Sequence, residues 1–350
     1  MKVNDFIKIG KRKVGKKYKP YIIAEVAQAH DGSLGMAHSY IDLAKNCGAD
    51  AVKFQTHIAD EESTKDDKFR VGNFVQDTTR YDYWKRMEFS EDQWRGLHEH
   101  AKLLNIDFLS TPFSIKAFKI LQRLDILAWK VGSGETQNIP LITKMLESSS
   151  PVIISTGLSS WQEIDSLVNM AKDYKSHFAL LQCTTAYPTE PNNIGLNILS
   201  EFSRRYDCVF GLSDHSGKIF SPVSALALGS SIIEAHITFS KSSFGPDAKA
   251  SLDPDQFKML VEARDFIYKM NKSPVKKEYL SNKNKDLKVL FGRSLVASKD
   301  IAKGEKLTKN HFLLKKPGGG LCYSDIANIK GKLSNRAYKK NEKLDKSLVI

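Results

Sequence analysis

The sequence predicts an α/β fold, a (β/α)8 TIM barrel followed by a small C-terminal domain of short strands. Eight short apolar runs rich in β-branched residues recur within the first 270 residues, and amphipathic stretches separate them. This alternation fits the roughly 250 residues of a TIM barrel. The charge distribution then changes. The last 80 residues carry 20 Lys and Arg against 7 Asp and Glu, whereas the first 270 carry 33 of each. Such an asymmetry indicates a second domain.

The strand-like runs alternate with stretches of helical period, as in a parallel sheet with crossover helices. Ser160 with Glu163 three residues later is a capping-box signal, and Ser90 precedes Glu91 at another helix start. Eight repeats favour a closed barrel over a doubly wound sheet. The predicted strands are 21–27, 51–56, 108–113, 128–133, 152–157, 178–184, 209–214 and 232–238, with helices between them such as 34–46, 90–104, 160–174 and 219–229.

Three segments lie outside this repeat. Residues 58–89 are too long and too charged for a plain βα loop, so we expect an insertion over the barrel mouth. Residues 271–286 are polar and rich in lysine, which predicts a linker. The sequence thus divides into a barrel at 1–270, this linker, and a small domain at 287–350. Within the insertion, we interpret the aromatic cluster of Tyr81, Tyr83 and Trp84 as packing rather than as a binding surface.

Composition narrows the class of protein. No apolar run reaches the roughly 18 residues that cross a bilayer, and the basic N-terminus lacks the apolar core of a signal peptide. The four cysteines form no C-x-x-C pair, which is typical of reduced thiols in a cytoplasmic protein. The net charge of +13 comes from scattered basic residues without a nucleic-acid-binding motif. We therefore expect neither nucleic acid nor membrane as a partner.

The C-terminal ends of the predicted strands carry the chemistry. In a TIM barrel the active site lies at these ends. A buried lysine is costly unless it pairs with a carboxylate or binds an anion. Lys53 and Lys130, with hydroxyl groups nearby, predict a cradle for phosphate and carboxylate, and pairing with barrel glutamates is the alternative. The strand ends, in chain order, carry Glu25, Lys53 with Gln55, Thr111 with Phe113, Lys130 with Ser133, Ser155, Thr185 with Tyr187, Ser213 with His215, and Glu234 with His236.

His215 and His236 end the seventh and eighth predicted strands, which are neighbours in a barrel. Imidazole is a frequent ligand of transition metals, so two such side chains can reach one ion. An isolated histidine is more often a hydrogen-bonded core residue. Because both lie at the expected mouth, the pattern favours a metal site. Two protein ligands leave positions open for water and a substrate carbonyl, as Lewis-acid catalysis requires.

Nine segments together resemble the N-acetylneuraminate (sialic acid) synthase family. The C-terminal unit resembles the antifreeze-like SAF domain of these synthases. The resemblance implies a domain-swapped homodimer in which this domain leans over the partner's barrel. The segments are IIAEVAQAHDGSLGMA (22–37), GADAVKFQT (48–56), FLSTPF (108–113), WKVGSGE (129–135), VIISTGL (152–158), LLQCTTAYP (180–188), GLSDHSG (211–217), EAHIT (234–238) and GPDAKASLDP (245–254).

The resemblance implies a reaction between phosphoenolpyruvate and the aldehyde form of an N-acyl amino sugar. His215 and His236 would hold a divalent ion that polarises the aldehyde, most often Mn2+, with Mg2+ or Co2+ as alternatives. C3 of phosphoenolpyruvate attacks the aldehyde, water adds at C2 with Glu25 as a candidate base, and phosphate leaves by C–O cleavage. The product is a nonulosonic acid. Catalysis would involve Lys53 as well. The residues expected to hold phosphoenolpyruvate are Lys53, Thr111, Lys130, Ser133, Ser155 and Ser213, and those expected on the sugar side are Glu25, Gln55, Thr185, Tyr187, Asp247 and Lys316. Phe113 is also expected to contact a substrate.

Three departures from the family pattern fall on the sugar side. The family's G-x-N-H-N-G stretch reads AQAHDG at 27–32, Thr185 stands where asparagine is frequent, and Lys316 stands where an arginine precedes P-G. A lysine cannot reproduce the planar, multi-donor contact of arginine. The departures predict an acceptor other than N-acetylmannosamine, for instance a dideoxy-diacetamido hexose that gives a legionaminic-type acid.

Three alternatives remain open at this point. One is a Schiff-base sugar-acid aldolase that uses Lys130 and needs neither metal nor phosphoenolpyruvate. Another is a 3-deoxy sugar-acid phosphate synthase, which needs additional basic groups for the acceptor's phosphate. A non-enzymatic alternative is that the C-terminal unit binds ice or a sugar polymer.

Overall fold

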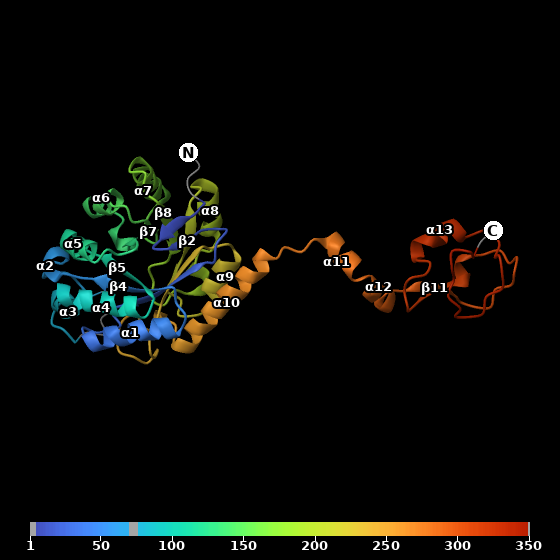
Figure 1. Cartoon of the computed structure of the whole chain (residues 1–350), viewed down its shortest axis with the longest axis horizontal. Helices are drawn as coiled ribbons and strands as arrows, with labels where there is room; N and C mark the ends of the chain where they lie inside the picture. Colours follow the sequence, from blue (N-terminus) through green and yellow to red (C-terminus); the bar gives the residue numbers. More distant parts are fainter. Residues whose placement is uncertain (1–4, 70–75, 349–350) are drawn as a thin grey trace. The chain divides into compact units, whose positions relative to one another are not determined.

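The computed structural model describes residues 5–69 and 76–348. The chain forms two compact units, Met1–Lys272 and Ser273–Ile350 (Figure 1). The predicted division into a barrel at 1–270, a linker at 271–286 and a small domain at 287–350 is finer than this, and its boundaries stay a prediction. Within the described ranges, no helix is long and apolar enough to cross a membrane.

A sheet of eight parallel strands, counted over the described residues, forms the centre of the first unit. Its spatial order is β5-β4-β3-β10-β9-β8-β7-β6, and the two end strands β5 and β6 lie against each other, so the sheet is nearly closed. The strand interiors are almost entirely buried, as expected for a sheet covered on both faces. The predicted barrel class is confirmed. The strands are β3 (Tyr21–Ala27), β4 (Ala51–Thr56), β5 (Asp107–Pro112), β6 (Trp129–Val131), β7 (Val152–Ser155), β8 (Phe178–Cys183), β9 (Val209–Asp214) and β10 (Ile232–His236).

Helices connect these strands and surround the sheet (Figure 1). Their apolar faces pack on the strands in one large core. Ser90 and Ser160 begin their helices with complete capping boxes, closed by Gln93 and Glu163. The crossover helices are α1 (Leu34–Asn46), α4 (Glu91–Leu103), α5 (Ile115–Arg123), α6 (Ile139–Glu147), α7 (Trp161–Asp173), α8 (Asn197–Arg205) and α9 (Phe220–Ala227), and α10 (Pro254–Lys272) follows the last strand.

A short N-terminal hairpin packs against one end of the barrel interior. Strands β1 (Ile7–Ile9) and β2 (Arg12–Val14) pair antiparallel around Gly10. Ile7, Ile9 and Val14 are buried in one cluster with residues from the starts of the barrel strands, such as Tyr21 and Ile232. The hairpin therefore covers the N-terminal end of the strands and leaves the opposite end for a cavity.

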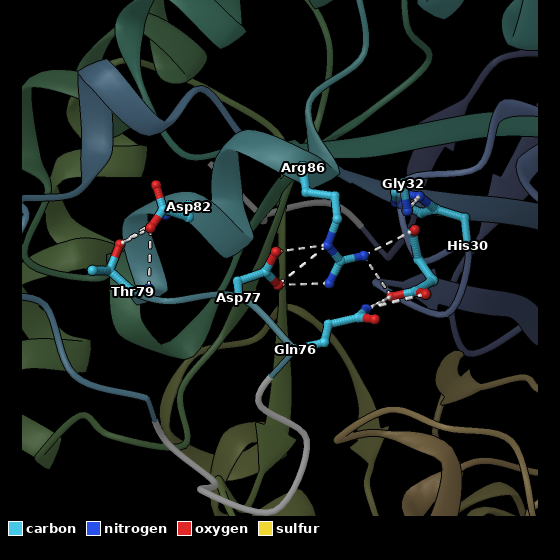
Figure 2. A network of polar contacts seen from close by, with 8 residues as sticks. His30, Gly32, Gln76, Asp77, Thr79, Asp82 and Arg86 are labelled. Atoms are coloured by element: carbon cyan, nitrogen blue, oxygen red, sulfur yellow. Dashed lines mark hydrogen bonds and ion pairs between the residues drawn. The ribbon is translucent and has the colours of Figure 1, made fainter.

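The insertion after β4 contains α2 (Ala59–Glu62) and α3 (Arg80–Met87). Figure 2 shows how α3 is tied to the loop after β3. The Arg86 guanidinium donates two hydrogen bonds to Asp77, from Nε at 2.9 Å and Nη2 at 2.8 Å. Its Nη1 reaches Asp31 Oδ1 at 2.7 Å and the Asp31 carbonyl oxygen at 3.0 Å. Residues of the insertion line the mouth of the barrel, as the sequence predicts.

The second unit has its own small core. Strands β11 (Ser294–Ala297) and β12 (Phe312–Lys315) pair antiparallel, and α13 (Ile326–Ile329) follows. The preceding segment is more regular than the linker prediction suggests, because it forms α11 (Lys277–Lys283) and α12 (Lys285–Phe291). The physical reason is that 276–291 contains no Gly or Pro and is rich in Lys and Leu, which are strong helix formers.

Candidate active site

A cavity of about 750 Å³ opens at the C-terminal ends of the barrel strands. The insertion and the loop after β10 complete its wall. All the barrel residues that the sequence singled out line this cavity, whereas Lys316 belongs to the second unit. The residues brought together are Glu25, Lys53, Gln55, Thr111, Phe113, Lys130, Ser133, Ser155, Thr185, Tyr187, Ser213, His215, Glu234, His236 and Asp247.

Lys53 lies at the floor of the cavity and is buried. Its Nζ forms an ion pair with Glu25 Oε2 at 2.7 Å and lies 3.8 Å from Glu234 Oε1. It also donates a hydrogen bond to Thr111 Oγ1 at 3.2 Å. The register of the sheet explains the first pairing, because β3 and β4 place Glu25 directly beside Lys53.

Lys130, on β6, is the second buried ammonium of the cavity. Its Nζ donates to Ser155 Oγ at 2.7 Å and to the Val131 carbonyl oxygen at 3.1 Å. Glu234 Oε1 lies 3.6 Å away and also accepts a hydrogen bond from Ser213 Oγ at 3.1 Å. Both lysines thus pair with barrel glutamates, the alternative considered above. Each also donates to a hydroxyl group at a strand end, and the cradle for phosphate and carboxylate stays a prediction.

Burial and nearby charges shift the pKa values of Glu25 and Glu234 in opposite directions. Burial raises the pKa of Glu25 to about 7, although the charge of Lys53 opposes the shift. Burial also acts to raise the pKa of Glu234, but Lys130, Lys53 and His236 outweigh it, and the pKa is lowered. Glu234 is therefore a permanent counter-ion at neutral pH, whereas Glu25 can take up and release a proton.

His215 and His236 lie near each other at the cavity wall, with ring centroids 5.2 Å apart. The Tyr187 ring stacks on His215 at 4.1 Å between centroids. The Thr184 carbonyl oxygen lies 2.9 Å from His215 Nδ1. Because a carbonyl oxygen only accepts hydrogen bonds, Nδ1 carries the proton and Nε2 keeps its lone pair. Burial lowers the pKa of His215 to about 3, which keeps the ring neutral.

This pair fits a metal ion with open coordination positions. A neutral imidazole whose other nitrogen donates to a backbone carbonyl is the usual arrangement of a metal-binding histidine. Over the residues that the structure describes, no group of three or more His, Cys, Asp or Glu side chains is arranged to hold an ion. A metal here would therefore depend on two protein ligands, with water and substrate in the remaining positions.

Comparisons with known proteins agree with this architecture. The NeuB family profile matches residues 40–276, and the SAF domain profile matches residues 292–349. The chain belongs to the NeuB family. It is 34% identical over 332 residues to N,N'-diacetyllegionaminic acid synthase of Campylobacter jejuni, which covers 93% of this chain and 98% of the relative.

Further similarities of this NeuB-family chain extend over most of its length. It is 33% identical over 336 residues to N-acetylneuraminate-9-phosphate synthase of Homo sapiens, covering 92% of this chain and 90% of the relative. The solved structure of N-acetylneuraminic acid synthetase from Leptospira borgpetersenii, in complex with citrate, superposes with a TM-score of 0.73 at 28% identity, covering 82% of this chain and 97% of that one. The chain is therefore an enzyme, a phosphoenolpyruvate-dependent transferase of the sialic-acid-synthase type.

Some residues at which this NeuB-family chain differs from its family pattern line the cavity, and others do not. Gln28 and Thr185 line the cavity. His30 is buried against the Phe89 ring, with centroids 4.8 Å apart, and the exposed Asp31 pairs with Arg86 (Figure 2). Within the AQAHDG stretch, Gln28 is therefore the residue placed to meet a substrate.

Sequence reasoning missed several residues of the cavity wall. Glu135, two positions after Ser133, could have been found from its place behind a strand end. Trp84 could not have been found in this way. The sequence indicated only that its aromatic cluster packs, whereas Trp84 both stacks on His57 and lines the cavity. The signal is missing because an insertion has no strand register that would predict which side chains face inward. The missed lining residues used below are His57, Glu61, Glu62, Asp67, Arg80, Trp84 and Glu135, whereas Gln28 belongs to the AQAHDG stretch that the sequence already placed on the sugar side.

Proposed function

We propose that this enzyme condenses phosphoenolpyruvate with the open-chain form of an uncharged N-acyl amino sugar, giving a nonulosonic acid and phosphate. The observation that carries the proposal is the pair of buried lysines, Lys53 and Lys130, beside strand-end hydroxyls and two histidines in one cavity. Membership of the NeuB family supports the reaction class.

The lysine end of the cavity is the proposed site for phosphoenolpyruvate. Lys53 and Lys130, with hydroxyl groups such as those of Thr111 and Ser155, supply charge-assisted hydrogen bonds to its phosphate and carboxylate oxygens. Ser133 and Ser213 extend this set of hydroxyls. An anion bound beside Lys53 competes with Glu25 for the same ammonium group, which makes the Glu25 carboxylate more available as a base.

The proposed reaction forms a C–C bond at C3 and a C–O bond from water to C2, and it breaks the C2–O bond to phosphate. C3 of phosphoenolpyruvate attacks the aldehyde carbon, whose oxygen becomes a hydroxyl by taking up a proton. Water adds to C2 and gives a proton to Glu25, whose pKa of about 7 suits a general base at neutral pH. The C2–O bond to phosphate then breaks, the C2 hydroxyl gives its proton to the departing phosphate, and a ketone remains at C2, while Lys53 and Lys130 stabilise the charge of the phosphate.

His215 and His236 would hold a divalent ion, for which we propose Mn2+. When bound, such an ion supplies Lewis acidity for a carbonyl oxygen. Two contacts hold the His215 ring in place. The Thr184 carbonyl fixes its tautomer, and the Tyr187 ring covers one face of the imidazole.

The charge of the remaining wall argues for an uncharged acceptor. Among the residues that the structure describes, four carboxylates line the part of the cavity that the insertion and the end of β6 provide, namely Glu61, Glu62, Asp67 and Glu135. Arg80 is a lining cation there, and its Nη1 already pairs with Asp67 Oδ1 at 3.3 Å. A phosphate monoester would meet net negative charge at this end. We therefore favour N-acetylmannosamine or a dideoxy-diacetamido hexose over a phosphorylated amino sugar.

We further propose that the enzyme works as a domain-swapped homodimer in the cytoplasm. Support for self-association comes from α11, α12 and Val275, two residues before α11, which expose apolar side chains on a segment next to the SAF domain in sequence. Support for a reducing compartment comes from the cysteines, which are all unpaired thiols. The exposed apolar residues are Val275, Tyr279, Leu280, Leu287, Val289, Leu290 and Phe291.

Phosphate release tests the proposal. The purified enzyme is incubated with phosphoenolpyruvate and, in turn, N-acetylmannosamine, its 6-phosphate and a dideoxy-diacetamido hexose, with and without a chelator. We expect acceptor-dependent release with the uncharged sugars, loss of release after chelation, and recovery on adding Mn2+. Release that favours the phosphorylated sugar would contradict the uncharged-acceptor proposal, and chelator-insensitive release would contradict the metal.

The environment of Lys130 favours a second candidate function, a Schiff-base aldolase. Burial lowers the pKa of Lys130, as in lysines that form Schiff bases. A Schiff-base aldolase would be labelled irreversibly by pyruvate and borohydride, with a mass increase at Lys130. We expect no label, because the Lys130 amine is already engaged by Ser155 and Val131.

A further inference from the structure

Glu62 is a buried carboxylate in the wall of the cavity that the reaction above does not use. It ends α2, the first helix of the insertion, and only 9% of its side chain is exposed. The helix start is fixed because the Ala59 backbone N–H donates to Glu88 Oε1 at 2.7 Å. Glu62 therefore projects from an anchored element rather than from a free loop.

An aromatic stack holds Glu62 in place. His57 lies between the Trp84 and Phe113 rings, at centroid distances of 4.0 and 4.3 Å and with nearly parallel planes. Its Nδ1 donates to Glu62 Oε1 at 2.7 Å. Trp84 and Phe113 also line the cavity, so the carboxylate lies beside an apolar wall.

The other ring nitrogen of His57 connects this wall to the reaction centre. Gln28 Nε2 donates to Gln55 Oε1 at 2.5 Å and lies 3.0 Å from His57 Nε2, which itself lies 3.1 Å from Gln55 Oε1. Gln55 Nε2 donates to Glu25 Oε1 at 2.8 Å. A continuous series of hydrogen bonds thus runs from Glu62 to the proposed base.

The second oxygen of Glu62 lacks a donor. Oε2 is buried and has no hydrogen-bond partner within the described part of the chain. A buried carboxylate oxygen is costly to leave unsatisfied. Glu135 lies near Glu62: burial raises the pKa of Glu135, the charge of Glu62 raises it further, and Asn138 Nδ2 already donates to Glu135 Oε2 at 2.9 Å. The second oxygen of Glu62 can therefore accept a hydrogen bond from a donor group of a ligand.

We propose that Glu62 is a specificity-determining residue that accepts a hydrogen bond from an acylamino N–H at the end of the acceptor sugar remote from the aldehyde. The inference rests on the proposed function, which places the aldehyde near the histidines. An acylamino group offers both an N–H donor and a methyl group, and the wall offers both a carboxylate and the aromatic rings of Trp84 and Phe113. A hydroxyl at the same position would satisfy the carboxylate alone.

The test compares two acceptors in the wild type, Glu62→Gln and the matched control Asp60→Asn. Asp60 is on the same helix, is exposed, and does not contribute to the cavity wall. Values of kcat and KM are measured at saturating phosphoenolpyruvate with a dideoxy-diacetamido hexose and with N-acetylmannosamine. We expect the wild type to favour the diacetamido sugar at least tenfold in kcat/KM. Glu62→Gln should lower this ratio about tenfold, mainly through KM, and Asp60→Asn should keep it within about twofold.

The outcomes separate this inference from the proposed function. A wild type that prefers N-acetylmannosamine overturns the inference without any variant, as does a Glu62→Gln enzyme with an unchanged acceptor ratio. An equal loss with both acceptors also overturns it, because it would reflect a structural role. If the wild type releases no phosphate with any acceptor, the proposed function itself fails.

Discussion

Glu25 and Glu234 are the same residue type in the same buried cluster, yet their surroundings separate them. Glu234 Oε1 lies within 3.8 Å of both lysine ammonium groups. Glu25 pairs with Lys53 and accepts from Gln55. With one ammonium near it, Glu25 does not recover the full cost of burial, and its pKa rises to about 7. Opposite shifts of this kind assign one carboxylate to proton transfer and the other to a fixed charge.

The raised pKa of Glu25 predicts the pH dependence of the reaction. Glu25 acts as a base only when it is ionised, and a pKa of about 7 makes the ionised form the minority below pH 7 and the majority above it. We expect kcat/KM to rise about tenfold per unit up to pH 7 and then to level off. Glu25→Gln should lose at least a hundredfold in kcat and show no such rise. The measurement is phosphate release between pH 5 and 9.

A matched control separates this effect from simple loss of charge near the site. Glu61 lies on the same cavity wall but is partly exposed and pairs with Lys116 at 3.8 Å. Glu61→Gln should keep the rise near pH 7. A Glu25→Gln enzyme with the wild-type pH profile would show that another group is the base.

The sequence was informative about individual residues where a strand defines their direction. Lys53, Lys130, His215 and His236 could be placed at one mouth because barrel strands end on the same side. The different roles of Glu25 and Glu234 could not be predicted, since they depend on distances of a few ångströms between strands that are far apart in sequence. The same holds for the Thr184 carbonyl that fixes the His215 tautomer.

At the scale of elements, Arg86 is one of the side chains that position the insertion, and Gln76, whose Nε2 donates to Asp31 Oδ1 at 3.0 Å, is another. Arg86 joins α3 to Asp77 within the insertion and to Asp31 in the loop after β3 (Figure 2). Because Glu62 and Trp84 belong to the same insertion, its position sets one wall of the cavity. The sequence predicted that 58–89 covers the mouth, but not which residues reach inward.

Removing this connection should loosen the insertion without touching the phosphoenolpyruvate site. For Arg86→Gln, we expect the KM for the acceptor to rise several-fold, the KM for phosphoenolpyruvate to stay within about twofold, and proteolysis within 58–89 to become faster. Arg95→Gln is the control, since Arg95 also pairs with acidic residues but lies on the exposed face of α4. Equal proteolysis rates in both variants would argue against the role of Arg86.

The N-terminal hairpin was not predicted as an element. Its strands have three residues each and are flanked by lysines, so neither period nor composition marks them. They are stabilised by the barrel interior, where Ile9 is fully buried. Elements whose stability comes from a distant part of the chain are not visible in local sequence patterns.

Truncation inside this hairpin should reduce stability rather than catalysis. Ile9→Ala removes buried methyl and methylene groups from a packed cluster, for which we expect a loss of about 2–4 kcal/mol in the free energy of unfolding. Lys8→Ala, on the exposed side of the same strand, should change it by less than about 0.5 kcal/mol. Urea denaturation measures both values. Similar stabilities for the two variants would mean that the hairpin does not contribute to the barrel core.

At the scale of the whole molecule, composition already separated the two units. The neutral first 270 residues form the barrel unit, and the lysine-rich remainder contains the SAF domain. The polar, lysine-rich composition was interpreted as a linker, although the absence of Gly and Pro from 276–291 favours the helices α11 and α12, and it did not predict that these helices would expose apolar side chains. Exposed apolar patches of this kind mark interfaces when they are not explained by packing within the chain.

These helices provide the last prediction, which concerns the assembly. Burial of their apolar side chains against a second copy would stabilise a dimer, since each fully buried leucine contributes roughly 1.5–3 kcal/mol. We expect light scattering to give a mass near twice the 39.4 kDa of one chain. Leu287→Asp combined with Leu290→Asp, three residues apart on one face of α12, should shift the mass toward one chain.

Lys285→Asp, which adds an aspartate to the same helix outside the apolar set, should leave the dimer intact. A wild type with the mass of one chain at micromolar concentration would contradict the dimer. A double variant that stays dimeric would place the interface elsewhere on the molecule.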